Sequence, residues 1–295
     1  MKSNMLHVNI DKCCYIHFKP KVSRNEVAKD EDIEENNSKV NINGIEIPEV
    51  ESTKYLGITI DNNLCWLPHI ETLHKKLKSV CGMIKRMITN IPSEHYKSLY
   101  YALFESHLSY CITVFGNANK NTTDRLFTTQ KHCIRILFGD LEAFIDKHST
   151  CCRTRPLENQ RLDHKFYCKE HTKPLFNEHK ILSMKNLYNY QTCIETFKII
   201  KFKYPKILYS LFFLSTRNNE SLLLSQPNSS SFTKDRTQLW NSCMKLIFKN
   251  DTLHDISIST IKHKLKDSLL KVQNAFDSVE WYSHLNSNLE TLNKL

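Results

Sequence analysis

Cationic side chains gather within one predicted helix, at residues 69–91. They are Lys75, Lys76, Lys78, Lys85 and Arg86. The same stretch holds one acid, Glu71, and a second predicted helix at 122–138 adds Lys131 and Arg135. Ammonium and guanidinium groups bind phosphate oxygens whatever the base sequence, and the chain carries a net charge of +10. The pattern therefore predicts contacts with a nucleic-acid backbone, and a merely solvated helix face is the alternative.

A second group of residues could bind a metal. His148 and Cys151 form a pair with two residues between them, as do Cys168 and His171, and four such side chains can ligate zinc tetrahedrally. Most zinc modules instead pair cysteines at a fixed spacing beside a glycine-containing knuckle, so unligated thiols are the preferred interpretation. The eleven cysteines are an odd number scattered along the chain, which favours reduced thiols in the cytoplasm or nucleus over a disulfide framework.

Motifs of the common enzyme classes are absent from the sequence. It contains no Gly-x-Ser-x-Gly, no glycine-rich phosphate loop, no His-Glu-x-x-His and no Asp-Asp pair. A Cys–His nucleophile stays open, because both residue types are plentiful and nothing fixes a pair. No apolar run approaches the ~18 residues that span a bilayer, and no leader opens the chain, so neither a membrane partner nor secretion is expected.

The elements that position these residues are of two kinds, and strands come first. Residues 40–47 alternate apolar and polar side chains around Asn43-Gly44, which predicts a tight hairpin. Residues 53–60 are rich in β-branched and aromatic side chains, and Gly57 is expected inside that strand at a bulge or close backbone approach. Two further strands are predicted on either side of a turn at residues 11–12.

Helices follow. Apolar residues at spacings of three and four predict helices at 69–91, 93–115, 122–138, 187–203 and 257–276. Pro68 is placed to open the first helix, and Ser93 is expected to cap the second. The first three helices have short connections, which predicts a compact bundle. An acidic stretch at 23–38 and a Ser- and Asn-rich stretch at 215–231 are predicted to be loops.

One ordered set of short segments carries a family resemblance. Residues 54–61 read Lys-Tyr-Leu-Gly-Ile-Thr-Ile-Asp and are followed by Leu64, Trp66, His69 and Ile70. This stretch resembles the junction between palm and thumb in the reverse transcriptases of non-LTR retrotransposons of the jockey type. Four further segments occur in the order that this family shows, namely Asn9-Ile10-Asp11-Lys12 with Phe18, residues 108–116, residues 130–136 and residues 239–242.

The resemblance implies a role for several residues. Tyr55, Leu56 and Gly57 match the primer-grip hairpin, whose backbone the primer end approaches closely. Lys12 matches a palm lysine that is placed to protonate the leaving pyrophosphate, although Cys13 replaces its partner threonine. In this family, palm carboxylates bind the two Mg²⁺ ions of polymerisation. Because the Asp-Asp turn is missing here, the chain is expected to begin after the catalytic site, to hold no cofactor and not to polymerise alone.

The predicted fold class is α+β and predominantly helical. Residues 1–67 are expected to be a palm remnant with the primer-grip hairpin, 68–140 a thumb-like helical bundle, 141–214 a basic connection rich in Cys and His, 215–231 a linker, and 232–295 a C-terminal helical segment. The expected function is binding of a template–primer duplex, an RNA–DNA hybrid, through its backbone. The alternative is a domesticated helical module for protein interaction, with partner surfaces on the linker and around Trp240.

Overall fold

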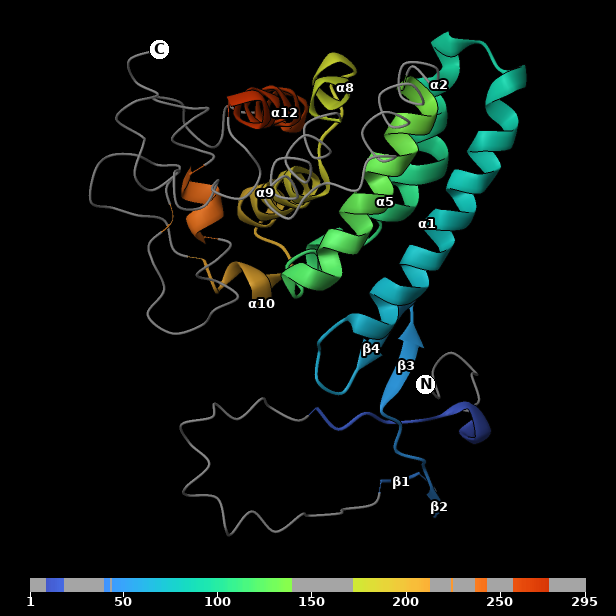
Figure 1. Ribbon diagram of the computed structural model, residues 1–295. Coiled ribbons are helices and arrows are strands. Elements are labelled where there is room, and N and C mark those ends of the chain that lie inside the picture. The colour runs from blue at the N-terminus through green and yellow to red at the C-terminus, as the bar shows by residue number, and fades with distance from the viewer. Residues whose placement is uncertain are drawn as a thin grey trace, which may run out of the picture.

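The computed structural model describes residues 9–18, 40–42, 44–139, 172–212, 224, 237–242 and 257–275. Within these residues the fold is α+β and predominantly helical, as predicted. Two antiparallel hairpins near the N-terminus precede the helices, and each hairpin is a sheet of two strands. Figure 1 shows the hairpins at one end of the molecule and the helices packed together beyond them.

The first hairpin joins β1 (Asn41–Ile42) to β2 (Ile45–Glu46), with Ile42 opposite Ile45. Gly44 in the turn has φ = 81°, which glycine adopts without steric cost. The predicted tight hairpin is therefore confirmed. Its second arm leads to Ile47, which is buried.

The second hairpin corrects the prediction for Gly57. β3 (Ser52–Tyr55) pairs with β4 (Ile58–Asp61), and Leu56 and Gly57 form the two-residue turn between them. Their φ angles of 47° and 86° are both positive, which is the backbone of a turn whose twist matches the flanking strands. Gly57 thus lies at the tip of the hairpin and not inside a strand.

The N-terminal segment also differs from its prediction. Residues Ile10–Lys12 form a short 3-10 helix, η2, which Cys13 ends by donating its backbone N–H to the Ile10 carbonyl. Beyond it, Tyr15 makes an isolated bridge with Glu49. The strand predicted after residue 12 is therefore wrong within 9–18, because only Tyr15 pairs there, donating its N–H to the Pro48 carbonyl at 3.1 Å and accepting from the Val50 N–H at 2.9 Å. Residues 1–8, which hold the other predicted strand, lie outside the described part of the chain.

Two long helices confirm the periodic patterns. α1 spans Leu67–Met87, has Pro68 in its first turn, and continues into a 3-10 turn at Ile88–Asn90. α5 spans Lys120–Phe138. α1 packs along α5, and both bury the apolar stripe that their spacing predicted.

The helix predicted at 93–115 is broken into pieces. They are the 3-10 helix η4 (Ser93–His95), α2 (Tyr96–Leu99), the π-helix η5 (Tyr100–Glu105), α3 (Ser106–Ser109) and α4 (Ile112–Phe115). Ser93 does not cap this segment, since its N-cap position is Pro92. The chain turns at Cys111, where φ is 54°, so that Leu108 before the turn and Ile112 after it both enter the core.

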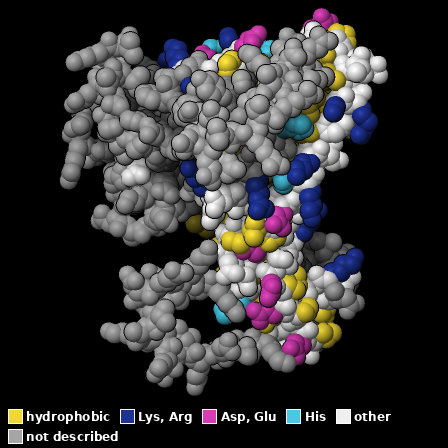
Figure 2. Space-filling view, viewed as in Figure 1, with side chains coloured by type: hydrophobic (Ala, Val, Ile, Leu, Met, Phe, Trp, Pro, Cys, Tyr) yellow, Lys and Arg dark blue, Asp and Glu magenta, His cyan; other side chains and the backbone are white. Residues whose placement is uncertain are grey.

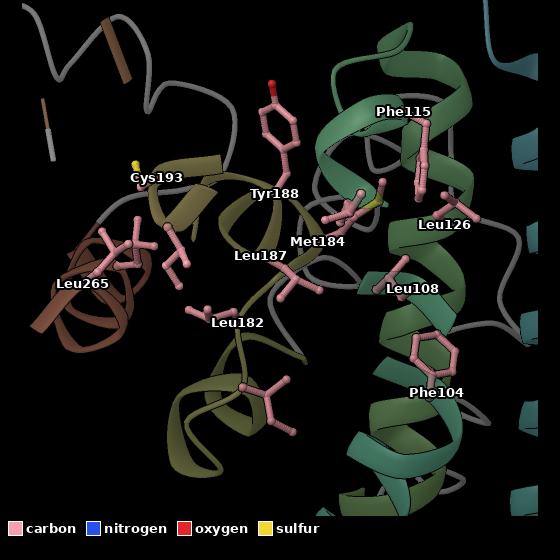
Figure 3. Close-up of a cluster of buried hydrophobic side chains, with 14 of the residues drawn as sticks. Phe104, Leu108, Phe115, Leu126, Leu182, Met184, Leu187, Tyr188, Cys193 and Leu265 are labelled. Atoms are coloured by element: carbon pink, nitrogen blue, oxygen red, sulfur yellow. The ribbon is translucent and has the colours of Figure 1, made fainter. Parts of the chain in front are cut away.

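α9 (Met184–Phe202) forms the centre of the remaining helices. Its neighbours in this part of the chain are α8 (Lys173–Glu178), α10 (Lys206–Tyr209) and α12 (Ile258–Ala275). The predictions at 187–203 and 257–276 are confirmed. In Figure 3, Met184 lies toward Phe115 and Leu126, while Leu187 and Leu182 lie between Leu108 and Leu265, and all of these side chains belong to one cluster. The described parts of the four domains predicted from residue 68 onward therefore share one hydrophobic core.

Two glutamines, Gln130, which is buried, and Gln273, which is half-buried, hold the chain that leads into α9. Gln130 of α5 is fully buried, donates to the Leu182 carbonyl at 2.9 Å and accepts from the Met184 N–H at 2.8 Å. From the other side, Gln273 of α12 accepts from the Ser183 N–H at 3.0 Å and donates to the Ile181 carbonyl at 3.1 Å. Alternate backbone groups of 181–184 therefore bond to two different helices.

The structure corrects the prediction that the segment around Trp240 presents a partner surface. Trp240 lies in a short helix at 237–242, has 0% exposure, and stacks on Phe197 at 6.3 Å between ring centroids. Of the predicted linker at 215–231 only Leu224 is described. It is buried, and its N–H and carbonyl both bond to the Asn241 side chain at 2.8 Å.

A half-buried carboxyl extends the network of Gln130. The Gln130 amide donates to the Tyr100 hydroxyl at 2.8 Å, and Tyr100 in turn hydrogen bonds to Glu105 within η5. Burial raises the pKa of Glu105 from 4.5 to about 7, although the charge of Lys266 and the bond from Tyr100 act in the opposite direction. Lys266 also donates to the Tyr101 hydroxyl at 3.4 Å, which ties α12 to η5.

We predict that Gln130→Ala destabilises the fold strongly. The change leaves the Leu182 carbonyl and the Met184 N–H buried without their partner, so the free energy of unfolding should fall by about 3 kcal/mol or more. Urea unfolding measures this loss. Gln191→Ala, at a half-buried position of α9, is the control and should cost less than about 1 kcal/mol. Equal losses for the two variants would contradict the role of Gln130.

We predict that Glu105 makes stability fall as pH rises. Its pKa is higher in the folded state, so its contribution is complete below about pH 4.5 and is lost as pH rises through about 7. Glu105→Gln stays neutral and should gain up to about 3 kcal/mol over the parent by pH 8. Urea unfolding across this pH range tests it, with the exposed Glu178→Gln as control. If the free energies of unfolding of the parent and of E105Q changed in parallel with pH, the prediction would be refuted.

Candidate nucleic-acid interface

The two helices that carry the predicted phosphate-binding residues lie side by side. Ile70, Leu77 and Ile84 of α1 and Leu126 and Ile134 of α5 are fully buried. Since these side chains occupy the inward stripes, the charged residues of both helices are left on their outward sides. Together α1 and α5 hold nine Lys and Arg residues against two acids, so they contain most of the net charge of +10.

All five predicted cations of α1 are exposed, whereas Lys131 and Arg135 of α5 are half-buried. Figure 2 shows Lys and Arg side chains, in dark blue, along the side of the molecule where Figure 1 draws α1. Histidines, in cyan, lie among them. The structure therefore leaves most of these cations available to a ligand.

Cations from the two helices meet around two histidines. Desolvation lowers the pKa of His74, and the charges of Lys78 and Arg125 lower it further. Desolvation also lowers the pKa of His132, with added contributions from Arg135 and Lys85. Each histidine thus lies near one cation of α1 and one of α5. We call these six residues the α1–α5 seam.

The spacing along the seam is regular. Lys78 and Lys85 lie seven residues apart on α1, and Arg125 and His132 lie seven apart on α5, which is close to two helical turns. The helices run in the same direction (Figure 1), so Lys78 lies near Arg125 toward one end of the seam and Lys85 lies near Arg135 toward the other. At the start of the seam, Arg125 makes an exposed ion pair of 3.9 Å with Glu71.

The remaining predicted cations are placed differently. Lys76 lies near His107 of α3, whose pKa is lowered by desolvation and then by the Lys76 charge, so Lys76 is on the other flank of α1. Lys131 places its ammonium 4.4 Å from the centre of the Phe127 ring. Arg125 was not among the predicted site residues. Its place on the same predicted helix as Lys131 and Arg135 was the signal in the sequence that could have identified it.

Asp61 connects the second hairpin to α1. Its carboxylate accepts hydrogen bonds from the backbone N–H groups of Cys65 at 3.0 Å and Trp66 at 2.9 Å. Burial alone would raise the pKa of Asp61, but these bonds outweigh it and lower the pKa. Trp66 has φ = 63° and is the N-cap residue of α1. A short, hydrogen-bonded turn therefore fixes how β4 leads into the helix.

The predicted primer-grip residues form the exposed tip of that hairpin. Tyr55 is 62% exposed and Leu56 is 73% exposed. Behind them, the Tyr110 hydroxyl donates to the Leu56 carbonyl at 2.6 Å. A Cβ on Gly57 would lie 3.5 Å from the Tyr110 ring, so the expected close approach at Gly57 involves this ring. Tyr110 was not predicted to support the hairpin.

The other candidates do not join this surface. Lys12 is exposed at the end of η2. His148, Cys151, Cys168 and His171 lie outside the described residues, as does most of the predicted connection. Within the described ranges, no group of three or more His, Cys, Asp or Glu side chains is arranged to hold a metal ion. In the same ranges, no helix is long and apolar enough to cross a bilayer.

No protein-family model, curated protein or solved structure matches this chain. The resemblance to reverse transcriptases accordingly stays a prediction from the sequence. The case for function then depends on the geometry of the seam and the hairpin.

We predict that Tyr110→Phe loosens the β3–β4 hairpin without unfolding the protein. Loss of the bond to the Leu56 carbonyl removes about 1 kcal/mol of local stability, so backbone amides of 52–61 should exchange about fivefold faster. Hydrogen–deuterium exchange measures this rate. Tyr204→Phe, at a side chain that is 72% exposed, is the control and should leave exchange at 52–61 unchanged. Unchanged exchange in Y110F would show that the hairpin does not depend on this bond.

Proposed function

We propose that this chain binds the sugar–phosphate backbone of a nucleic-acid duplex along the α1–α5 seam. The observation that carries the proposal is the meeting of Lys78 and Arg125, and of Lys85 and Arg135, around the two histidines. Like charges gathered on one surface repel one another, and a polyanion relieves that repulsion by neutralising them. Four cations spread along two neighbouring helices, Lys78 and Lys85 on α1 and Arg125 and Arg135 on α5, suit an extended polyanion better than a small anion.

The β3–β4 hairpin supports an RNA–DNA template–primer duplex as the ligand. Its exposed tip, Tyr55 and Leu56, is joined to α1 through the hydrogen bonds of Asp61 and to α3 through Tyr110. The tip of the β3–β4 hairpin and the seam therefore keep a fixed position relative to each other. This arrangement suits contact with the primer end at the tip and with the duplex backbone along the helices, as the resemblance to a reverse-transcriptase palm and thumb implies.

The proposed role is to hold the duplex and not to catalyse polymerisation. Two-metal polymerisation needs paired carboxylates, and the 295 residues contain no Asp-Asp pair. In the family that the chain resembles, the Mg²⁺ ions of polymerisation are bound by palm carboxylates, and this chain has no counterpart of their Asp-Asp turn. Cys81, Cys133 and Cys193 are buried and form no disulfide among the described residues, which is consistent with a reducing cytoplasm or nucleus as the place of action.

The alternative, a module for protein interaction, has less support. One of its two predicted partner surfaces was the segment around Trp240. That side chain has 0% exposure and packs on Phe197, so it is not available to a partner without unfolding.

We predict that replacing Lys78 and Lys85 of the seam, together with the neighbouring exposed Lys75 of α1, with Gln weakens duplex binding and flattens its salt dependence. Each lost phosphate contact releases about one counterion fewer, so the slope of log K against log salt should decrease by about 2 to 3. Fluorescence anisotropy with a labelled RNA–DNA hybrid of about 20 base pairs measures this slope between about 50 and 200 mM salt.

The matched control replaces Lys262, Lys264 and Lys271 of α12 with Gln. These lysines are also exposed, and the change in net charge is the same. The control should keep the slope of the parent. If both triple variants lost the same affinity and slope, net charge alone would explain binding and the seam would not be the site. An unchanged slope in the α1 variant would also reject the proposal.

A further inference from the structure

A second surface combines exposed apolar side chains with positive charge, and it lies where α9 ends and α10 follows. Four large apolar side chains are exposed there. They are Phe202 at 59%, Tyr204 at 72%, Ile207 at 80% and Leu211 at 40%. Such exposure contrasts with the body of α9, most of whose side chains are buried. An exposed apolar cluster of this kind on a folded chain marks an interaction surface.

The local backbone explains why these side chains leave the core. Lys203 has φ = 52° and ends α9, and Pro205 precedes the four-residue helix α10. The turn takes the chain off the buried path of α9. Phe202 and Tyr204 flank Lys203, and their Cα atoms are at most about 7 Å apart because they are only two positions apart in the chain.

The charge around this cluster is of one sign. Lys198, Lys203 and Lys206 are exposed, and no Asp or Glu occurs between Glu195 and Phe212. We call Phe202, Tyr204, Ile207, Leu211 and these three lysines the α9–α10 patch. None of its residues belongs to the α1–α5 seam or to the β3–β4 hairpin.

We propose that the α9–α10 patch binds single-stranded nucleic acid, with unpaired bases stacked on Phe202 and Tyr204 and phosphates held by Lys198, Lys203 and Lys206. Aromatic rings interleaved with cations suit this ligand, because every base has a face that can stack and every nucleotide carries a phosphate. A duplex fits the patch poorly, since its bases are stacked on one another and cannot reach the rings. The patch therefore selects strands that are not paired.

An anionic membrane is the competing ligand, and the structure favours it less. Proteins that lie on membranes commonly insert one face of a long amphipathic helix. α10 has four residues and the body of α9 is buried, so neither helix can lie in a membrane surface in that way. The two exposed aromatic rings lie at the end of α9 and in the link after it.

The test compares a single strand with a duplex on the full chain. Fluorescence anisotropy with an oligothymidylate of about 20 nucleotides, which does not pair with itself, should show at least about tenfold weaker binding for Phe202→Ala/Tyr204→Ala than for the parent. Affinity for the RNA–DNA hybrid should stay within about twofold, because the seam is unchanged. Replacing Lys198, Lys203 and Lys206 with Gln should lower the salt slope for the single strand by about 2.

Phe18→Ala is the matched control, since Phe18 is also an exposed ring, at 50%, and should leave oligothymidylate binding unchanged. Ile207→Ser, with vesicles of phosphatidylcholine and phosphatidylserine, tests the competing ligand. If Ile207→Ser and the double variant both abolished vesicle binding and left oligothymidylate affinity unaltered, the proposal would be overturned in favour of a membrane surface. Unaltered oligothymidylate affinity in the double variant would overturn it in any case.

The triple variant of α1 separates the two proposals. It should weaken binding of the hybrid and keep the stacking contribution to binding of the single strand.

Discussion

The hydrogen bonds of Gln130 are the constraint on which the arrangement of the helices depends. The residue is fully buried, and its amide bonds to the Leu182 carbonyl, the Met184 N–H and the Tyr100 hydroxyl. Buried backbone groups without a partner cost about 1 to 3 kcal/mol each, so the path of 181–184 is tied to one place on α5. Gln273 bonds to the alternate groups of the same segment and thereby ties α12 to it. The direction in which α9 leaves this segment follows from these bonds.

The same helix, α5, therefore has two separate roles. Its inner side carries Gln130 and the apolar residues that pack against α1 and α9, while its outer side carries Arg125 and Arg135. A close-packed interior does not deform gradually, so the spacing between the cations of α1 and those of α5 is set by the core. Desolvation keeps His74 and His132 neutral to lower pH than usual, and so the permanent charges of Lys and Arg determine the seam potential at neutral pH.

Sequence reasoning succeeded where one local period determined the structure, and it was wrong where distant residues did. The spacing of apolar residues in α1, α5, α9 and α12 predicted each helix, and Asn-Gly predicted the first hairpin. The break at Cys111 was missed because Leu108 and Ile112 keep a helical spacing on both sides of it. Tyr110 beside that break bonds to Leu56, 54 residues away in sequence, and no local pattern reports such a contact. Cations were identified by type, but the pairing of Arg125 with Lys78 required knowledge of which helices are neighbours.

α9 gives the two proposed nucleic-acid surfaces a definite spatial relation. Its first residue, Met184, bonds to Gln130 within α5, and its last, Phe202, begins the α9–α10 patch. A helix rises about 1.5 Å per residue, so about 27 Å of helix separates Phe202 from the contact with α5. The seam lies on the outer sides of α1 and α5, whereas the patch lies at the end of α9 and on α10. Because the seam is proposed to hold a duplex and the patch an unpaired strand, a nucleic acid that engages both changes from paired to unpaired along its length, and this is the form of a template whose end extends beyond its primer.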